Sequence, residues 1–237
     1  MTYCLAMKLN KGLLFAADSR TNAGVDHVST YRKLHLFKQE GRFVVLLSAG
    51  NLATTQSIIS RLTTRNEENE MSLLNTSSLY SIAKMIGRTT HKVITTLKEQ
   101  PIDESIDFSA NFIVGGQIEG EEPRLFLIYP EGNFIEAQEE TPYFQIGESK
   151  YGKPIIDRVI HYETPLWKAR TCALISFDST IKSNLSVGLP LDIMTYVSNS
   201  FDFSNVERIV EENAYFKKLG YAWSDGVTRL FQEMPEN

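Results

Sequence analysis

Short apolar runs dominate the first fifty residues, and longer stretches with a helical period follow them. Asn10-Lys11-Gly12 and Glu40-Gly41 are turn sequences, and each is flanked by two apolar runs of strand length. This pattern predicts two β-hairpins, with strands at 3–9 and 13–18 and then at 33–38 and 43–49.

The segment after the second hairpin has the spacing of helices. Residues 51–65 are predicted to be helical with Asn51 as the N-cap, and 66–75, rich in Glu and Asn, to be a loop. Apolar residues recur every three or four positions through 77–99, and Pro101 ends that helix. Its apolar stripe looks wide for one sheet face to cover, so we expect this helix to make contacts between subunits.

The remainder repeats the order of strands and then helices. Three short β-rich runs are divided by Gly, Pro and Asn, and two helical stretches, a strand and a terminal region follow. The predicted strands are 110–116, 125–129, 134–137 and 193–198, and the predicted helices are 154–162, 168–182 and 206–218. The pattern of 222–231 fits a strand or a helix.

Hairpins followed by two helices, twice over, indicate an α+β protein in which two packed sheets carry helices on their outer faces. No Pro/Gly/Ser-rich linker divides the chain. We therefore expect one domain over residues 1–237 in a four-layer αββα arrangement, with 206–237 as an extension.

Composition excludes several classes of function. The 237 residues carry a net charge of −5, which argues against a nucleic-acid partner. Neither Cys4 nor Cys172 has the neighbouring ligands of a zinc site, and we expect no metal ion or other cofactor. The first ten residues lack the apolar core of a signal peptide, and no apolar run is long enough for a membrane span. These features predict a cytoplasmic protein without a membrane partner.

Thr2 follows the initiator methionine at the edge of the first predicted strand. Removal of Met1 would leave a hydroxyl and a free α-amine on one residue, and a small second residue is what methionine aminopeptidases accept. The hydroxyl can attack a carbonyl, and an amine with a pKa of about 7.7–8 can take its proton. Because many proteins begin with Met-Thr, the interpretation depends on residues downstream.

Three downstream features fit this chemistry. Asp18 ends the second strand, and Lys33 opens the next hairpin. A lysine held beside the Thr2 hydroxyl would favour the alkoxide, and Asp18 would keep that lysine charged. The small residues Ser48-Ala49-Gly50 precede a helix, where backbone N–H groups can form an oxyanion hole.

These motifs, in this order, resemble proteasome β-type subunits, the threonine peptidases of the N-terminal nucleophile (Ntn) hydrolase class. The resemblance is carried by Thr2, Ala17-Asp18-Ser19-Arg20, Arg32-Lys33-Leu34-His35 and Ser48-Ala49-Gly50. Residues 18–26 and 47–56 look similar to the bacterial Anbu (ancestral β-subunit) branch of the family. The likeness is clear over 2–56 and sparser to about residue 200.

The resemblance implies roles for individual residues. Thr2 would be the nucleophile, Asp18 and Lys33 its electrostatic partners, and Gly50 the oxyanion donor. Asn22 and Ser48 would line the substrate groove, with Ser48 leaving a roomy pocket. Ser149 would help to orient the amine. The resemblance also implies a catalytic Asp at 178 with a serine partner at 183 or 186; Glu148 and Ile181 depart from the family pattern.

The resemblance implies a peptidase enclosed in a large homo-oligomer, built as a ring stack or an open helical turn. It leaves open an ATPase or adaptor partner. Two alternatives remain: an Ntn amidase or acyl-transfer enzyme acting on small amides, and a non-catalytic structural subunit on the same fold. The terminal threonine and the Asp/Lys pair favour the peptidase, because the family's structural subunits generally lack them.

Overall fold

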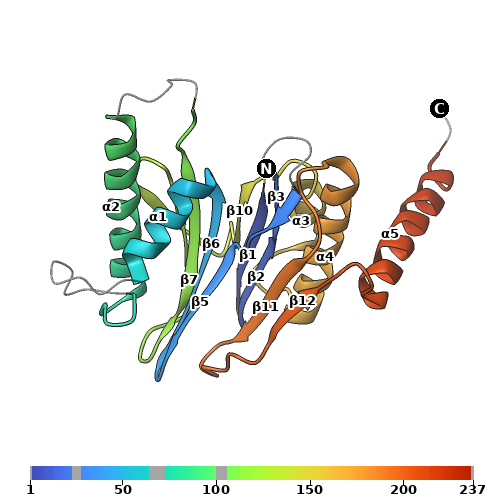
Figure 1. Cartoon of the computed structure of the whole chain (residues 1–237). Coiled ribbons are helices and arrows are strands. Elements are labelled where there is room, and N and C mark those ends of the chain that lie inside the picture. Colours follow the sequence, from blue (N-terminus) through green and yellow to red (C-terminus); the bar gives the residue numbers. More distant parts are fainter. Residues whose placement is uncertain (1, 23–27, 64–72, 100–105, 236–237) are drawn as a thin grey trace.

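The computed structural model describes residues 2–22, 28–63, 73–99 and 106–235. Two antiparallel five-stranded sheets pack face to face, and helices lie on the outer side of each sheet (Figure 1). The predicted α+β fold with four αββα layers is therefore confirmed.

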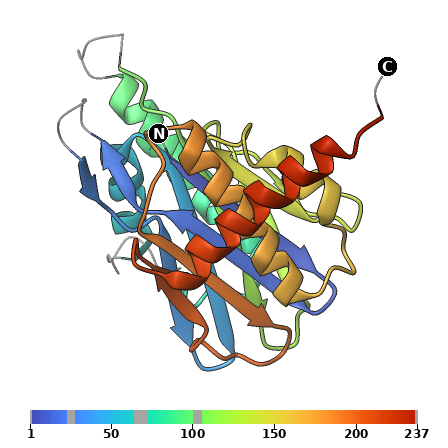
Figure 2. The same ribbon diagram turned by 90° about the vertical axis from the view of Figure 1, so that its right-hand side faces the viewer.

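One sheet has the strand order β10-β1-β2-β11-β12. Its strands are β1 (Tyr3–Leu9), β2 (Gly12–Asp18), β10 (Tyr143–Gly147), β11 (Leu191–Val197) and β12 (Val206–Ile209). The helices outside it are α3 (Lys153–Val159), α4 (Leu166–Ser183) and α5 (Ala214–Gln232). Figure 2 shows α5 lying across α4, farther from the sheet.

The other sheet has the order β5-β6-β7-β8-β9. Its strands are β5 (Leu34–Gln39), β6 (Arg42–Gly50), β7 (Ala110–Ile118), β8 (Arg124–Ile128) and β9 (Phe134–Glu136). Its outer helices are α1 (Leu52–Thr63) and α2 (Leu79–Lys98). A separate ribbon pairs β3 (Arg20–Asn22) with β4 (Val28–Thr30).

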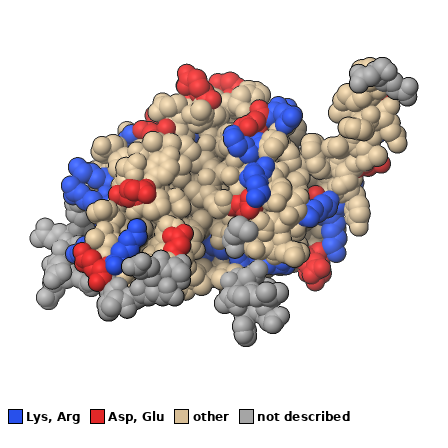
Figure 3. Space-filling view, turned by 90° about the horizontal axis from the view of Figure 1, so that it is seen from above, with Lys and Arg blue, Asp and Glu red and all other residues tan. Residues whose placement is uncertain are grey.

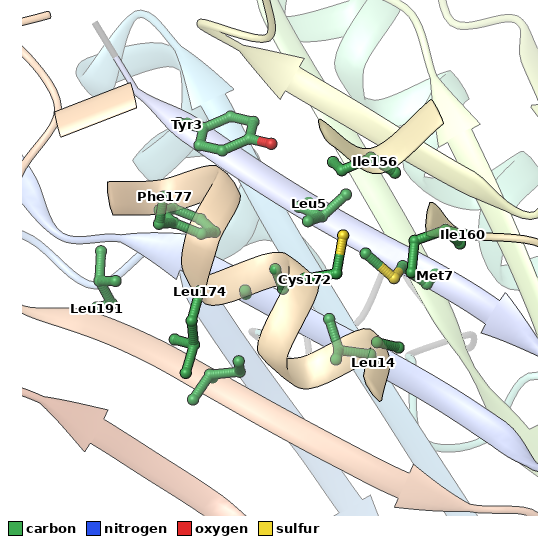
Figure 4. Packing of buried hydrophobic residues seen from close by; sticks show 14 of the residues in the cluster. Tyr3, Leu5, Met7, Leu14, Ile156, Ile160, Cys172, Leu174, Phe177 and Leu191 are labelled. Atoms are coloured by element: carbon green, nitrogen blue, oxygen red, sulfur yellow. The ribbon is translucent and has the colours of Figure 1, made fainter. Parts of the chain in front are cut away.

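Strand β1 is buried on both faces, which explains why its sequence is almost continuously apolar. Successive strand residues point to opposite faces. Tyr3, Leu5 and Met7 pack against α3 and α4 (Figure 4), whereas Cys4 and Ala6 pack between the two sheets. This double burial holds the start of β1, next to Thr2, in a fixed position.

Capping residues fix where the helices begin. Asn51 Oδ1 accepts a hydrogen bond from the Thr54 backbone N–H at 3.1 Å, as predicted. Ser78 caps α2 in the same way through Ser81. The apolar stripe of α2 is covered by the second sheet. Among the described residues of this helix, Tyr80 is the only large apolar side chain that is exposed. The expectation of an uncovered stripe on this helix was wrong.

The C-terminal prediction also needs correction. Residues 206–218 are not one helix, because Val206–Ile209 forms strand β12 against β11 and α5 begins at Ala214. The undecided stretch 222–231 belongs to α5. Strand β10 was not predicted, although Phe144 and Ile146 alternate with less buried residues along it.

No helix in the described part of the chain is both long and apolar enough to cross a membrane.

Candidate active site

A buried ion pair joins Asp18 at the end of β2 to Lys33 just before β5. Lys33 Nζ lies 2.8 Å from Asp18 Oδ1, and the exposed fractions of the two side chains are 6% and 0%. The ammonium also donates to the Arg20 carbonyl at 2.6 Å. A buried ammonium requires such partners, and these two contacts hold the Lys33 side chain in place.

The same carboxylate is tied to the start of β1. The Tyr3 backbone N–H donates to Asp18 Oδ1 at 3.0 Å, one residue beyond Thr2. Burial raises the pKa of the Asp18 carboxyl, and Lys33 and the Tyr3 N–H oppose that shift. Asp18 Oδ2 is buried and has no hydrogen-bond partner among the described residues. Among the groups that oppose the rise in the Asp18 pKa, Lys33 has the largest effect.

Thr2 and Lys33 open into one cavity of about 510 Å³. The cavity lies between the ends of the two sheets and the start of α1. Its lining residues are Thr2, Arg20, Thr21, Tyr31, Lys33, Ser48, Ala49, Gly50, Asn51, Leu52, Thr55, Asn111 and Gly147. Thus the structure brings Thr2, Lys33, Ser48 and Gly50 together, with Asp18 buried behind Lys33.

Gly147 holds the backbone of Thr2 at a close approach. The Glu148 N–H donates to the Thr2 carbonyl at 2.7 Å, which extends the pairing of β1 with β10 by one residue. Gly147 has φ of +81°, and a Cβ there would come within 1.8 Å of the Thr2 carbonyl oxygen. Only glycine meets both requirements without displacing Thr2.

Gly50 closes β6 on the opposite side of the cavity. Its φ is +115°, and a Cβ would come within 2.3 Å of the Ser109 carbonyl oxygen. Helix α1 begins two residues later, so Gly50 lies next to the N-terminus of a helix, where the dipole favours negative charge.

The two predicted groove residues lie on different elements. Ser48 is buried and lines the cavity, and its backbone N–H donates to the Lys33 carbonyl at 3.1 Å. Asn22 ends β3, where it pairs with Val28. Its neighbours Arg20 and Thr21 line the cavity, so the β3–β4 ribbon borders it.

Ser149 is half-buried and does not line this cavity. Its carbonyl accepts a hydrogen bond from the Lys153 backbone N–H at the start of α3. The preceding residue, Glu148, is the one that contacts Thr2. The signal for it in the sequence was a carboxylate in place of a small residue, directly after Gly147.

The structure does not bring Asp178 into the site. Helix α4 continues to Ser183, so Asp178 stays within it and its carboxylate binds Lys182 at 2.8 Å. A Cβ on Gly220 of α5 would lie 2.6 Å from Asp178 Oδ1. Asp178 therefore belongs to the contact between α4 and α5, and its predicted role beside Thr2 is not supported.

Neither of the two serines proposed to accompany Asp178 is among the residues that line the cavity with Thr2. Ser183 borders the same outer cavity as Asp178, and the Ser186 N–H donates to Asn184 Oδ1 at 2.9 Å. Asn184 itself reaches the site, because its side-chain amide donates to Glu148 Oε2 at 2.8 Å. Sequence reasoning missed this residue, since nothing local marks an asparagine after a helix.

Within the described ranges, no three His, Cys, Asp or Glu side chains gather in a way that could hold a metal ion.

The model of the family described as proteasome subunit matches residues 2–187. The chain belongs to the proteasome-subunit family. A solved structure of Anbu from Yersinia bercovieri is 55% identical, covers 100% of this chain and 99% of its own, and superposes with a TM-score of 0.92. The Anbu complex from Pseudomonas aeruginosa, described as a helical assembly, is 47% identical, with coverage of 100% and 98% and a TM-score of 0.94.

An Anbu mutant from Hyphomicrobium sp. strain MC1 is 46% identical with a TM-score of 0.92, covering 100% of this chain and 99% of that one. Comparison with curated proteins found no match. The resemblance to the Anbu branch, first carried by residues 18–26 and 47–56, thus extends over the whole chain.

Proposed function

We propose that this chain is an N-terminal threonine peptidase that hydrolyses peptide bonds within a homo-oligomeric assembly. Thr2 is the nucleophile after removal of Met1, which lies outside the described residues. The observation that carries the proposal is the buried Lys33–Asp18 pair, which opens into the same cavity as Thr2 and Gly50.

The cycle uses groups already present around that cavity. The Thr2 hydroxyl attacks the peptide carbonyl while its proton passes to the α-amine, and Lys33 stabilises the developing alkoxide. The Gly50 N–H receives the oxyanion. When the C–N bond breaks, the ammonium returns the proton to the leaving amine, and water then hydrolyses the ester on Thr2.

The substrate follows from the surroundings of the site. A cavity of about 510 Å³ bordered by the β3–β4 ribbon has room for side chains next to the scissile bond and an adjacent strand for extended peptide. A small-amide hydrolase on the same fold is the second candidate, because the Thr2 chemistry is equally suited to it. Cleavage of peptide libraries compared with small-amide panels separates the two.

The third candidate is a non-catalytic subunit, which would not need the Lys33–Asp18 ion pair beside the cavity. Such a role leaves no reason to bury Lys33 and Asp18, since a buried ion pair contributes little net stability. Intact mass and covalent labelling test this candidate. Loss of one methionine, with an electrophilic peptide attached at Thr2, is expected; labelling elsewhere or none at all would favour the structural role.

We propose that α5, and not α2, makes the contact between subunits. Helix α5 packs on α4 through Phe216, Leu219 and Gly220, and most of its other large apolar side chains are exposed. The exposed set on α5 is Tyr215, Tyr221, Val227, Leu230 and Phe231. Figure 3 shows the C-terminal end of the chain projecting from the body. Such a surface is typical of a contact with another subunit, and the related Pseudomonas aeruginosa complex is described as a helical assembly.

A further inference from the structure

Glu148 lies directly opposite Thr2. The β1–β10 register pairs Tyr3 with Gly147, and the hydrogen bond from the Glu148 N–H to the Thr2 carbonyl continues it by one residue. Residues opposite each other in antiparallel strands have Cα atoms about 4.5–5.5 Å apart. The Glu148 side chain therefore starts within reach of the Thr2 α-amine.

The carboxylate of Glu148 is buried, and the one cation paired with it among the described residues is a largely exposed lysine. Only 7% of the residue is exposed. Asn184 Nδ2 donates to Oε2 at 2.8 Å, while Lys150 Nζ lies 3.6 Å from Oε1 on a side chain that is 69% exposed. One neutral donor and one loosely held lysine are weak compensation for a buried carboxylate. A further positive charge at this position would satisfy it.

We propose that Glu148 positions the Thr2 α-amine and stabilises the ammonium that forms on it, with Asn184 orienting the carboxylate. This inference rests on the proposed function. As Thr2 Oγ bonds to the substrate carbon, the hydroxyl proton moves to the amine, and the carboxylate stays ionised throughout. The carboxylate of a Ser-His-Asp triad supports its imidazolium in the same manner.

Other charged and titratable groups around Thr2 act on the same amine. Lys33 and Arg20 line the cavity and disfavour a nearby ammonium, so a carboxylate is needed to balance them. The groups that face this region are Cys4 from β1, Asp18 from β2, Arg20 from β3, Tyr31 and Lys33 before β5, and Lys150 after β10. All of them remain in a Glu148→Gln variant, so a difference reports on Glu148 alone.

The first test is the pH dependence of kcat/KM. Removing the charge in Glu148→Gln should move the rising limb to lower pH by about one unit, because an adjacent carboxylate favours the ammonium. The maximum should fall about tenfold or more, while Glu148→Asp restores the position of the limb. Glu139→Gln, at an exposed carboxylate, is the matched control and should match the parent.

The second test does not need turnover. The rate at which acetic anhydride acetylates the Thr2 amine, measured against pH by mass spectrometry of the N-terminal peptide, reports directly on the amine. The profile should shift to lower pH in Glu148→Gln, and less so in Asn184→Ala. The Asn184 variant also serves if Glu148→Gln does not fold.

The outcomes separate the two proposals. Unchanged pH profiles in both tests would overturn the role of Glu148 and leave the Thr2 mechanism intact. Full activity in Thr2→Ala would overturn the proposed function itself, and the acetylation profile would still show whether Glu148 faces the amine.

Discussion

Lys33 Nζ lies 2.8 Å from Asp18 Oδ1, and both side chains are almost completely shielded from water. A second ion pair of the same length, Lys182 with Asp178, lies on the surface of α4, with 55% of the lysine side chain exposed. The two pairs thus have the same N···O distance, but only the lysine of the second pair is largely exposed, which provides a comparison of the effect of burial.

Lys33→Met should lower the free energy of unfolding by about 3–5 kcal/mol at neutral pH, because Asp18 becomes a buried charge without a partner. Lys182→Met should cost about 1 kcal/mol or less, since water screens the exposed pair. Urea denaturation followed by circular dichroism measures both. Equal losses in the two variants would contradict the burial argument.

The sign of the pH dependence follows from the Asp18 pKa. Burial raises this pKa in the folded protein, and removal of Lys33 takes away the main opposing cause. A carboxyl whose folded pKa exceeds its unfolded value loses stability as pH rises from the unfolded pKa to the folded one. The deficit of Lys33→Met should therefore be smaller at acidic pH than at neutral pH.

The proposed nucleophile gives the second prediction. Thr2→Ala should reduce peptidase activity by several orders of magnitude, because the hydroxyl is the only attacking group in the proposed site. Thr2→Ser keeps a hydroxyl and an α-amine and should retain measurable turnover. Both are compared by kcat/KM on peptide substrates, with circular dichroism to verify the fold. Turnover equal to the parent in Thr2→Ala would exclude the mechanism.

The third prediction compares alanine substitutions at Gly147 and Gly120, which separates the cost of a steric clash from the cost of backbone strain. Gly147 and Gly120 both have positive φ, +81° and +85°. A Cβ at 147 would collide with the Thr2 carbonyl oxygen at 1.8 Å, whereas a Cβ at 120 meets nothing within 4 Å. Gly120→Ala should cost only the conformational strain, about 1 kcal/mol.

Gly147→Ala should cost clearly more stability than Gly120→Ala and should also lower kcat, because Thr2 must move to relieve the clash. Thermal unfolding and single-turnover kinetics measure the two effects. Loss of stability without loss of kcat would show that the position of Thr2 tolerates the displacement.

The sequence predicted the hairpins that carry Thr2, Asp18 and Lys33 because each is local, with its turn residues between two apolar runs. Strand β12 pairs with the neighbouring β11 but was missed because it is short and mostly exposed, so it lacks an apolar alternation. Strand β10 was missed because it pairs with β1, which is remote in sequence, and only the folded sheet reveals that partner. The contact of Glu148 with Thr2 depends on β10 and was hidden for the same reason. Asp178 was misplaced because the family spacing was followed there, although the predicted helix 168–182 already contained it and α4 runs to Ser183.

The last prediction concerns the contact between subunits. Tyr221 and Phe231 of α5 are 77% and 79% exposed, and each could bury a large apolar area against a second copy. The double variant Tyr221→Ser/Phe231→Ser should reduce the mass of the assembly. The control is Tyr80→Ser on α2, where the apolar stripe is already covered and Tyr80 is 48% exposed.

Sedimentation velocity at micromolar concentration measures these masses against the 26.9 kDa of one chain. The parent and Tyr80→Ser should sediment as the same large particle, and the α5 variant as smaller species. The activity of the separated subunits then shows whether the active site must be enclosed in an assembly. A peptidase with an open site would act on any accessible chain, so a fully active parent monomer would remove the need for enclosure and favour the small-amide reaction.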